Sequence, residues 1–267
     1  MKHADPRTLE ARFTIGQVLA LAWRAWLACR WHIALIGAPT AIAAVGARWF
    51  ASPHIEGAIP AAWQEMVHMW LGVLVETSAY VAITFAALSY MRGQDVSARN
   101  VFRLPWQRLP SILVAGLALQ AMIWWPEALL EWPIDGGHRV IIDYAILIIN
   151  VLVFDVLTFV WLPVLVIENA SIVSAFRRSI HLATRHPWRL LAIDIGFWGV
   201  YYLFFAVAGE VYLAIDPEWM DLAWRAVIVV WIVFSMPVAC CLAAAAYHLV
   251  RIEHEGPAPE TLARVFD

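Results

Sequence analysis

Long apolar stretches alternate with short polar segments along the whole chain. Each apolar stretch has about 20 residues or more, the length that an α-helix needs to cross about 30 Å of hydrocarbon. The stretches lie at about 31–50, 66–91, 109–130, 140–167, 188–215 and 222–250. This pattern predicts an all-α, polytopic membrane protein, with six transmembrane helices in a single domain over residues 1–267 and a cytoplasmic tail at 251–267.

The polar segment at 168–190 has the periodicity of an amphipathic helix. One face would carry polar side chains, at Ser174, Arg177, Arg178, His181 and Arg185. A second face would carry apolar side chains, at Ile172, Phe176, Ile180 and Ala183. Asn169 or Ser171 is the expected N-cap, and Pro187 is the expected stop. A basic helix of this kind lies at a membrane surface, so we expect its arginines, Arg189 included, to face lipid phosphates and Phe176 to face the acyl chains.

Similar basic stretches precede two other spans, at 13–30 and 96–108, and the second contains Arg99 and Arg103. The spans that follow these segments begin about 79 residues apart, as expected for a repeated unit. We therefore expect three membrane hairpins, each preceded by a cytoplasmic amphipathic helix. The alternative is that basic loops make any protein built of hairpins look periodic.

Composition and charge support the membrane assignment and add an orientation. Hydrophobic residues make up 63% of the chain and charged residues 15%, whereas soluble domains have about 45–50% and about 25%. All but three of the 18 lysines and arginines lie on one side of the predicted spans, the exceptions being Arg48, Arg139 and Arg225. Because basic loops stay in the cytoplasm, both termini are expected there.

Several kinds of chemistry have no residue pattern in this chain. The three cysteines, Cys29, Cys240 and Cys241, lie in or beside apolar segments, where small buried thiols are the expected role. The histidines are scattered without metal-ligand spacing, so no metal, pigment or other cofactor is expected. No glycine-rich phosphate loop or nucleophile elbow is present. The sequence therefore predicts no enzyme, and basic loops that meet membrane phosphates rather than nucleic acid.

Two carboxylates fall near the middle of predicted spans, Glu76 in the second and Asp155 in the fourth. Ionisable residues inside a membrane are costly and are candidates for function. If the two helices adjoin, Glu76 and Asp155 would share a proton or hold a cation. The alternative is that each is protonated or hydrogen-bonded to a nearby hydroxyl or amide side chain.

Other charged residues near span ends have simpler expected roles. Glu210 and Arg225 approach the outer ends of the fifth and sixth spans, where a structural ion pair is expected. Asp194 lies within two turns of the inner end of the fifth span, where pairing with an arginine such as Arg189 is expected.

Two parts of the sequence resemble one family of membrane proteins. The first is a carboxylate that closes a span, Glu168, followed by AFRRS at 175–179 and HPWRLL at 186–191. The second is a last span that runs into a Tyr-x-Leu-x-Arg tail, from Tyr247 to Arg251. These letters resemble the YciC-like proteins and the membrane domain of glycerophosphoryl diester phosphodiesterases, over about 40 residues. The resemblance implies six spans with cytoplasmic surface helices in a bacterial cytoplasmic (inner) membrane, without the catalytic domain.

Taken together, these patterns favour a non-enzymatic accessory, scaffold or assembly subunit of a membrane complex. Its expected partners are membrane phospholipids and either other integral membrane proteins or further copies of the chain. The alternative function is a small proton- or cation-coupled transporter that uses Glu76 and Asp155.

Overall fold

The computed structural model describes residues 13–55, 61–94, 110, 112–114, 116–117, 155–168, 170–213 and 217–256. All regular structure in these ranges is helical, as predicted. The helices are α1 (Ile15–Ile55), α2 (Ala61–Met91), α6 (Val156–Thr158), α7 (Trp161–Ile167), α8 (Ile172–Ala183), α9 (Pro187–Leu213) and α10 (Pro217–Glu255).

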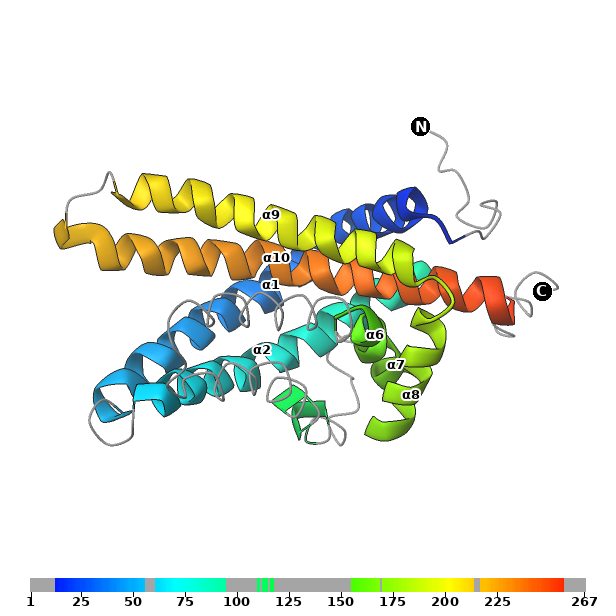
Figure 1. The fold of residues 1–267 in the computed structure, drawn as a ribbon, viewed down its shortest axis with the longest axis horizontal. Helices are drawn as coiled ribbons and strands as arrows, with labels where there is room; N and C mark the ends of the chain where they lie inside the picture. Colours follow the sequence, from blue (N-terminus) through cyan, green and yellow to red (C-terminus); the bar gives the residue numbers. More distant parts are fainter. Residues whose placement is uncertain are drawn as a thin grey trace, which may run out of the picture.

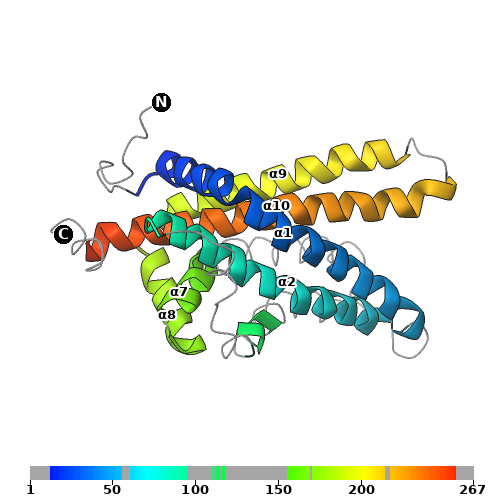
Figure 2. The same cartoon turned by 180° about the vertical axis from the view of Figure 1, so that it is seen from behind.

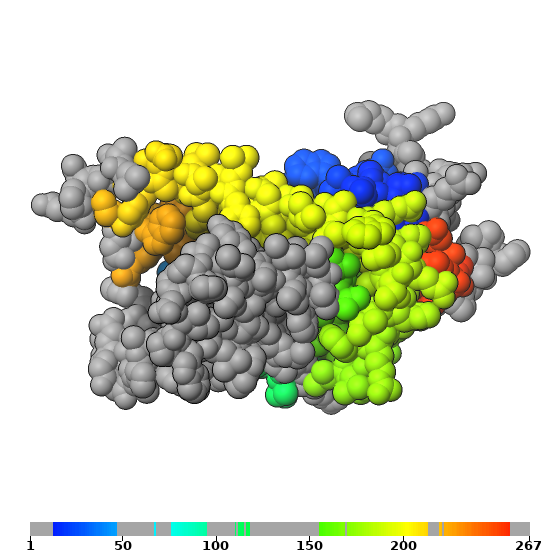
Figure 3. All heavy atoms as spheres, viewed as in Figure 1, coloured from blue at the N-terminus to red at the C-terminus, as the bar shows by residue number. Residues whose placement is uncertain are grey.

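Within the described residues, three helices are long and apolar enough to cross a membrane: Ile15–Gly46 within α1, Pro187–Tyr212 within α9 and Leu222–Glu255 within α10. Large apolar side chains on them face outward, with Trp31, Leu203 and Phe234 each more than half exposed. In the space-filling view α9 forms one long open edge of the molecule (Figure 3). Contiguous apolar surface of this extent is unfavourable in water but suits lipid. The prediction of an all-α protein with several helices long and apolar enough to span a membrane is confirmed.

The long helices form two antiparallel pairs, α1 with α2 and α9 with α10 (Figures 1 and 2). α1 and α2 pack along each other, and α10 crosses against both. α9 runs beside α10, which follows it after a short connection in the sequence. The start of α1, the last turn of α2, α8 and the end of α10 lie at one end of the molecule, whereas the two pairs diverge toward the other end.

Small residues form the contact between α1, α2 and α10. Ala86 and Ala87 on α2 and Ala245 on α10 are fully or almost fully buried. The Cys29 thiol on α1 donates to the Ala86 carbonyl at 3.8 Å, and the Cys240 thiol on α10 donates to the Tyr80 carbonyl at 3.7 Å. Side chains this small let helix backbones approach closely, which is how helices associate in lipid. The prediction of buried, unpaired cysteines is confirmed at all three positions.

Aromatic rings, by contrast, fill the space between α9 and α10. The Trp231 ring on α10 lies 5.2 Å from Tyr201, 5.0 Å from Phe204 and 5.7 Å from Phe205 on α9, measured between ring centroids. Nearer the connection, Trp224 lies 5.4 Å from Tyr212. Edge-to-face and tilted contacts at these distances are favourable. They fix the relative register of the two helices along much of their length.

The first span does not have the predicted boundary. An amphipathic helix at 13–30 and a span at 31–50 were expected, but one helix, α1, runs through both and continues past Pro39. Between Arg30 and Gly37 the chain has no glycine, proline or capping residue that would end a helix. The N-terminal part of α1 nevertheless runs at an angle to the rest (Figure 2). The predicted entry helix and the predicted first span are therefore parts of one helix.

The fourth predicted span is interrupted where the structure describes it. A continuous helix was expected over 140–167, but residues 155–167 form α6 and α7 with a turn at Phe159 and Val160. Pro163 explains the position of the break, because it lacks the N–H that would bond to the carbonyl of Phe159. The break leaves α6 and α7 as two short helices on which α8 rests.

The remaining spans agree with the prediction to different extents. α2 covers the expected span at 66–91, and α9 coincides with the span at 188–215. α10 is longer than the span at 222–250, because helix continues into the expected tail as far as Glu255. Most of the span at 109–130 lies outside the described residues. Within its described part, Gly116 lies so close to α2 that a Cβ there would be 3.1 Å from the Thr77 hydroxyl oxygen.

Candidate functional site: the charged end of the helix bundle

The surface helix predicted at 168–190 is present as α8, and its N-terminus is capped as the sequence indicates. The Ser171 side chain accepts a hydrogen bond from the Ser174 N–H at 3.3 Å, and the Ser174 hydroxyl donates to the Ser171 carbonyl at 2.9 Å. Ser171 is therefore the N-cap. The helix ends at Ala183, before Pro187, and Pro187 instead begins α9, a position that proline favours.

The buried face of α8 is rotated from the predicted apolar stripe. Ala175, Ser179 and Leu182 are its most buried residues, together with Ala183, and they pack toward α6 and α7. The Ser179 hydroxyl donates to the Leu157 carbonyl at 2.6 Å. Phe176, expected to face acyl chains, is instead half-buried against the core of the protein. The reason is the break between α6 and α7, which exposes both an apolar surface and a free carbonyl for α8 to cover.

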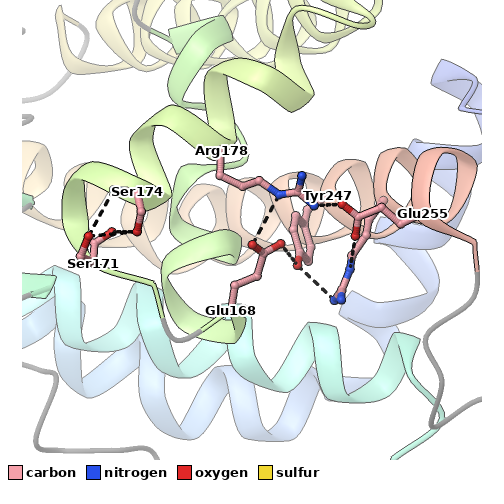
Figure 4. A network of polar contacts seen from close by, with 7 residues as sticks. Glu168, Ser171, Ser174, Arg178, Tyr247 and Glu255 are labelled. Carbon is pink, nitrogen blue, oxygen red and sulfur yellow. Dashed lines mark hydrogen bonds and ion pairs between the residues drawn. The ribbon is translucent and has the colours of Figure 1, made fainter.

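One arginine of α8 is held between two carboxylates (Figure 4). The Arg178 Nε lies 3.5 Å from Glu168 Oε2, at the end of α7, and its Nη2 forms an ion pair with Glu255, the last residue of α10. All three side chains are less than 40% exposed. Arg178 therefore links three helices and is not available as a surface charge.

Two further residues of α10 complete this network. The Tyr247 hydroxyl donates to Glu168 Oε1 at 2.8 Å. Arg251 donates through Nη1 to the Tyr247 hydroxyl at 3.3 Å and through Nε to Glu255 at 3.1 Å. Glu168 is about 80 residues from Tyr247 and Arg251 in the sequence, and the fold brings the three together. Sequence reasoning did not assign them to one cluster, because no local pattern connects positions about 80 residues apart.

What remains on the outer face of α8 is a basic stripe formed by Arg177, His181 and Arg185. All three side chains are exposed, and they follow one another at intervals of four residues along one side of the helix. Within the described residues, none of them forms an ion pair with an acid. The predicted docking residues Arg99 and Arg103 lie outside the described residues.

A second group of contacts ties the start of α1 to the end of α10. The Phe13 N–H donates to Glu253 Oε2 at 2.9 Å, and His186 Nε2 lies 3.3 Å from the same oxygen. The His186 ring lies 4.9 Å from the Phe13 ring in a tilted contact and stacks on the His254 ring at 5.6 Å, measured between centroids. Arg189, a predicted docking residue, donates to the Phe13 carbonyl. This cluster joins α1, α9 and α10 at the charged end.

The His186 imidazole makes this cluster sensitive to pH. Burial lowers the pKa of His186 from its ordinary value of 6.5, and the positive charge of Arg189 and the neighbouring His254 lower it further, against an opposing effect of Glu253. A lowered pKa means that the folded protein binds fewer protons than the unfolded chain. The stabilisation is therefore complete above about pH 6.5 and is lost as the pH falls through the lower folded-state pKa.

We expect acidification to lower the unfolding temperature of the wild-type protein more than that of His186→Gln, which has no proton to gain. Thermal unfolding in nanodiscs, followed by circular dichroism above and below about pH 6.5, measures the difference. His181→Gln removes an exposed imidazole from the basic stripe and should keep the wild-type response. Equal pH dependence in wild type and His186→Gln would contradict the assignment.

The intramembrane carboxylates are placed differently from the prediction in one respect. Asp155 accepts a hydrogen bond from the Trp198 indole of α9 at 3.0 Å, and Asp194 lies one turn before Trp198 on the same helix. The structure thus places Asp155 on the side of α9 that carries Asp194, and pairing of Asp155 with Glu76 stays a prediction.

Asp194 does not have the partner expected for it. Arg189 was the expected partner, but its guanidinium donates to the Phe13 carbonyl at the helix end. Asp194 faces inward and is 4% exposed. The sequence does indicate another neighbour for Asp194, because Asp194 and Trp198 are four residues apart and so share a face of α9.

The expected ion pair between Glu210 and Arg225 stays a prediction. Glu210 is exposed near the end of α9, and Arg225 is half-buried on the early part of α10. The contact between Tyr212 and Trp224 shows that these parts of the two helices are adjacent.

Comparison with known proteins finds no matching family model, no matching curated protein and no matching solved structure.

Proposed function

We propose that the chain is a non-enzymatic integral membrane protein that acts as an accessory, scaffold or assembly subunit of a membrane complex. In this proposal it has six spans arranged as three hairpins in a bacterial cytoplasmic membrane, as its resemblance to the YciC-like family implies. Its charged end faces the cytoplasm, and the basic stripe of α8 contacts anionic lipid headgroups and partner proteins.

The observation that carries the proposal is that only one of the basic residues of α8 is ion-paired within the described residues, while the others are exposed. Arg178 is neutralised by Glu168 and Glu255, which anchors the helix to α7 and α10. Arg177, His181 and Arg185 stay exposed, without an acidic partner in the described part of the chain. A rigid helix that presents uncompensated positive charge beside apolar spans suits an anionic surface, because each arginine near such a surface contributes about 1 kcal/mol.

The arrangement of charge supports the orientation. Basic residues of the described chain gather at the end of the molecule where α1 starts and α10 ends, at Arg92, Arg177, Arg178, Arg185, Arg189 and Arg251. A strongly exposed tryptophan, Trp188, stands at the same end, where spans begin. Basic residues on the cytoplasmic side and tryptophan at the interface are the usual features of a membrane protein.

Replacing Arg177 and Arg185 together by glutamine should weaken binding of anionic lipid about 30-fold, because two contacts of about 1 kcal/mol each are lost. The measurement is a titration of the protein, in a mild neutral detergent, with short-chain phosphatidylglycerol. Phosphatidylcholine should bind wild type and variant alike. The matched control is Arg24→Gln with Arg30→Gln, which removes two exposed arginines from α1 instead.

Co-purification of the same variants in mild detergent tests the accessory role. We expect a stoichiometric protein partner that stays with the wild type and the α1 control and is reduced with the α8 variant. A clean monomer in every case would contradict an accessory role. Equal lipid binding by all variants would instead show that the basic stripe only marks topology.

A further inference from the structure

A buried carboxylate on the inner face of α9 lacks a hydrogen-bond partner for one oxygen. Asp194 is 4% exposed, and no donor reaches its Oδ2 within the part of the chain that the structure describes. Its neighbours Leu190 and Ile193 are also buried, whereas Ile195 and Val200 face outward. An ionised carboxylate left unpaired in apolar surroundings is strongly unfavourable. Asp194 therefore needs a bound proton or cation.

A second carboxylate lies beside it, at the start of α6. Asp155 Oδ2 accepts the hydrogen bond of the Trp198 indole at 3.0 Å, and Trp198 follows Asp194 by one turn on α9. The indole and the two carboxyl groups therefore lie together where α6 contacts α9. Two carboxylates this close in a poorly solvated site do not both stay ionised.

We propose that Asp155 and Asp194 form an intramembrane proton-binding site that holds one proton at neutral pH. The proton resides on Asp194, whose oxygen has no other partner, while the indole N–H of Trp198 stabilises the ionised Asp155. The proton is taken up from solvent and forms one O–H bond, so no other group is consumed. This site goes beyond the scaffold role, because it gives the protein a titratable group inside the membrane.

A proton fits this site better than a metal cation. The indole N–H presents its positive end to the carboxylates, and an N–H group cannot act as a ligand for a cation. Within the described residues, no group of three or more histidine, cysteine or carboxylate side chains could hold a metal ion. Asp194 lies about 10 Å along the helix axis from the start of α9, at 1.5 Å per residue. The bound proton is therefore close to the charged end of the bundle.

Infrared spectroscopy of the full chain in lipid nanodiscs tests the proposal through the C=O stretch of protonated carboxyl groups. At neutral pH the wild type should show a band with the intensity of one protonated carboxyl group, and this band should be absent from Asp194→Asn. The matched control is Glu210→Gln, which changes an exposed carboxylate on the same helix and should leave the band intact. Asp155→Asn should shift the frequency of the band, because it removes the neighbouring charge.

Two results would overturn the site. One is a wild-type spectrum that matches those of Asp194→Asn and Asp155→Asn, which would show that neither carboxylate holds a proton. The other is loss of the wild-type band on addition of sodium chloride but not choline chloride, which would show a cation site. If Asp194→Asn does not fold, the frequency shift in Asp155→Asn decides the question, and an unshifted band overturns the proposal.

Discussion

Arg178→Ala should lower the free energy of unfolding by about 2 kcal/mol. Removing the guanidinium breaks its ion pairs with Glu168 and Glu255, and of these two carboxylates Glu255 keeps its ion pair with Arg251. Exposed ion pairs contribute up to about 1 kcal/mol, and breaking a fully buried pair costs about 3–5 kcal/mol. The partial burial of this network places Arg178 between these limits. Thermal or denaturant unfolding in detergent, followed by circular dichroism, measures the change.

The neighbouring arginine provides a close control for this experiment. Arg177→Ala removes the same side chain from the next position of α8, but Arg177 is exposed and should change stability by no more than about 0.5 kcal/mol. The two variants should also differ in limited trypsin digestion, because a loosened α8 exposes the chain after it. Cleavage after Arg185 or Arg189 should be faster in Arg178→Ala than in Arg177→Ala. Equal stability of the two variants would show that the network in Figure 4 does not hold α8 in place.

A coupling measurement shows whether Arg178 and Glu168 act on each other directly. Glu168→Gln should lose much of its effect when Arg178 is already alanine, since the partner is then absent. Additive losses would assign the stability to separate contacts of the two residues.

Ala245→Leu should destabilise the bundle by about 2 kcal/mol or more. Ala245 is fully buried on α10, where that helix meets α1 and α2. Adding three carbons to a packed contact displaces side chains or backbone and typically costs about 1–3 kcal/mol. In a membrane, close packing of helices is a main source of their association, so a side chain that separates them weakens the bundle. The unfolding midpoint in a denaturing detergent titration measures the effect.

The same substitution on α9 is the matched control. Ala206 is exposed on the outward side of α9, where leucine would meet lipid. Ala206→Leu should therefore leave stability almost unchanged. Destabilisation by Ala206→Leu equal to that by Ala245→Leu would mean that the outward side of α9 is also a packed contact.

Much of the secondary structure could be predicted from single segments of sequence. The cap at Ser171, the start of α9 at Pro187 and the long helices over the second, fifth and sixth apolar stretches follow from local rules for helix ends and apolar length. The burial of Cys29, Cys240 and Cys241 follows from their apolar surroundings. These features depend on residues within a few turns of one another.

The predictions that were wrong concern segments whose local sequence pattern is compatible with two different structures. Basic and apolar residues at 13–30 suit a separate surface helix, but they also suit the first turns of a longer helix, which is what α1 contains. Phe176 suits a lipid-facing side chain, but also a side chain at the edge of a protein contact, which is where it lies. In both cases periodicity shows which residues share a face, and not what covers that face.

The sequence by itself determined that this protein is helical, apolar enough for a membrane, and basic near both termini. These properties depend on composition and on spacing along one helix. Only the tertiary structure decided that Arg178 is an internal anchor while Arg177 stays exposed, and that Asp155 bonds to Trp198 on α9. The physical reason is that an ion pair or a shared proton depends on which helices are neighbours. Neighbouring helices in this protein are set by small buried residues and by the break between α6 and α7.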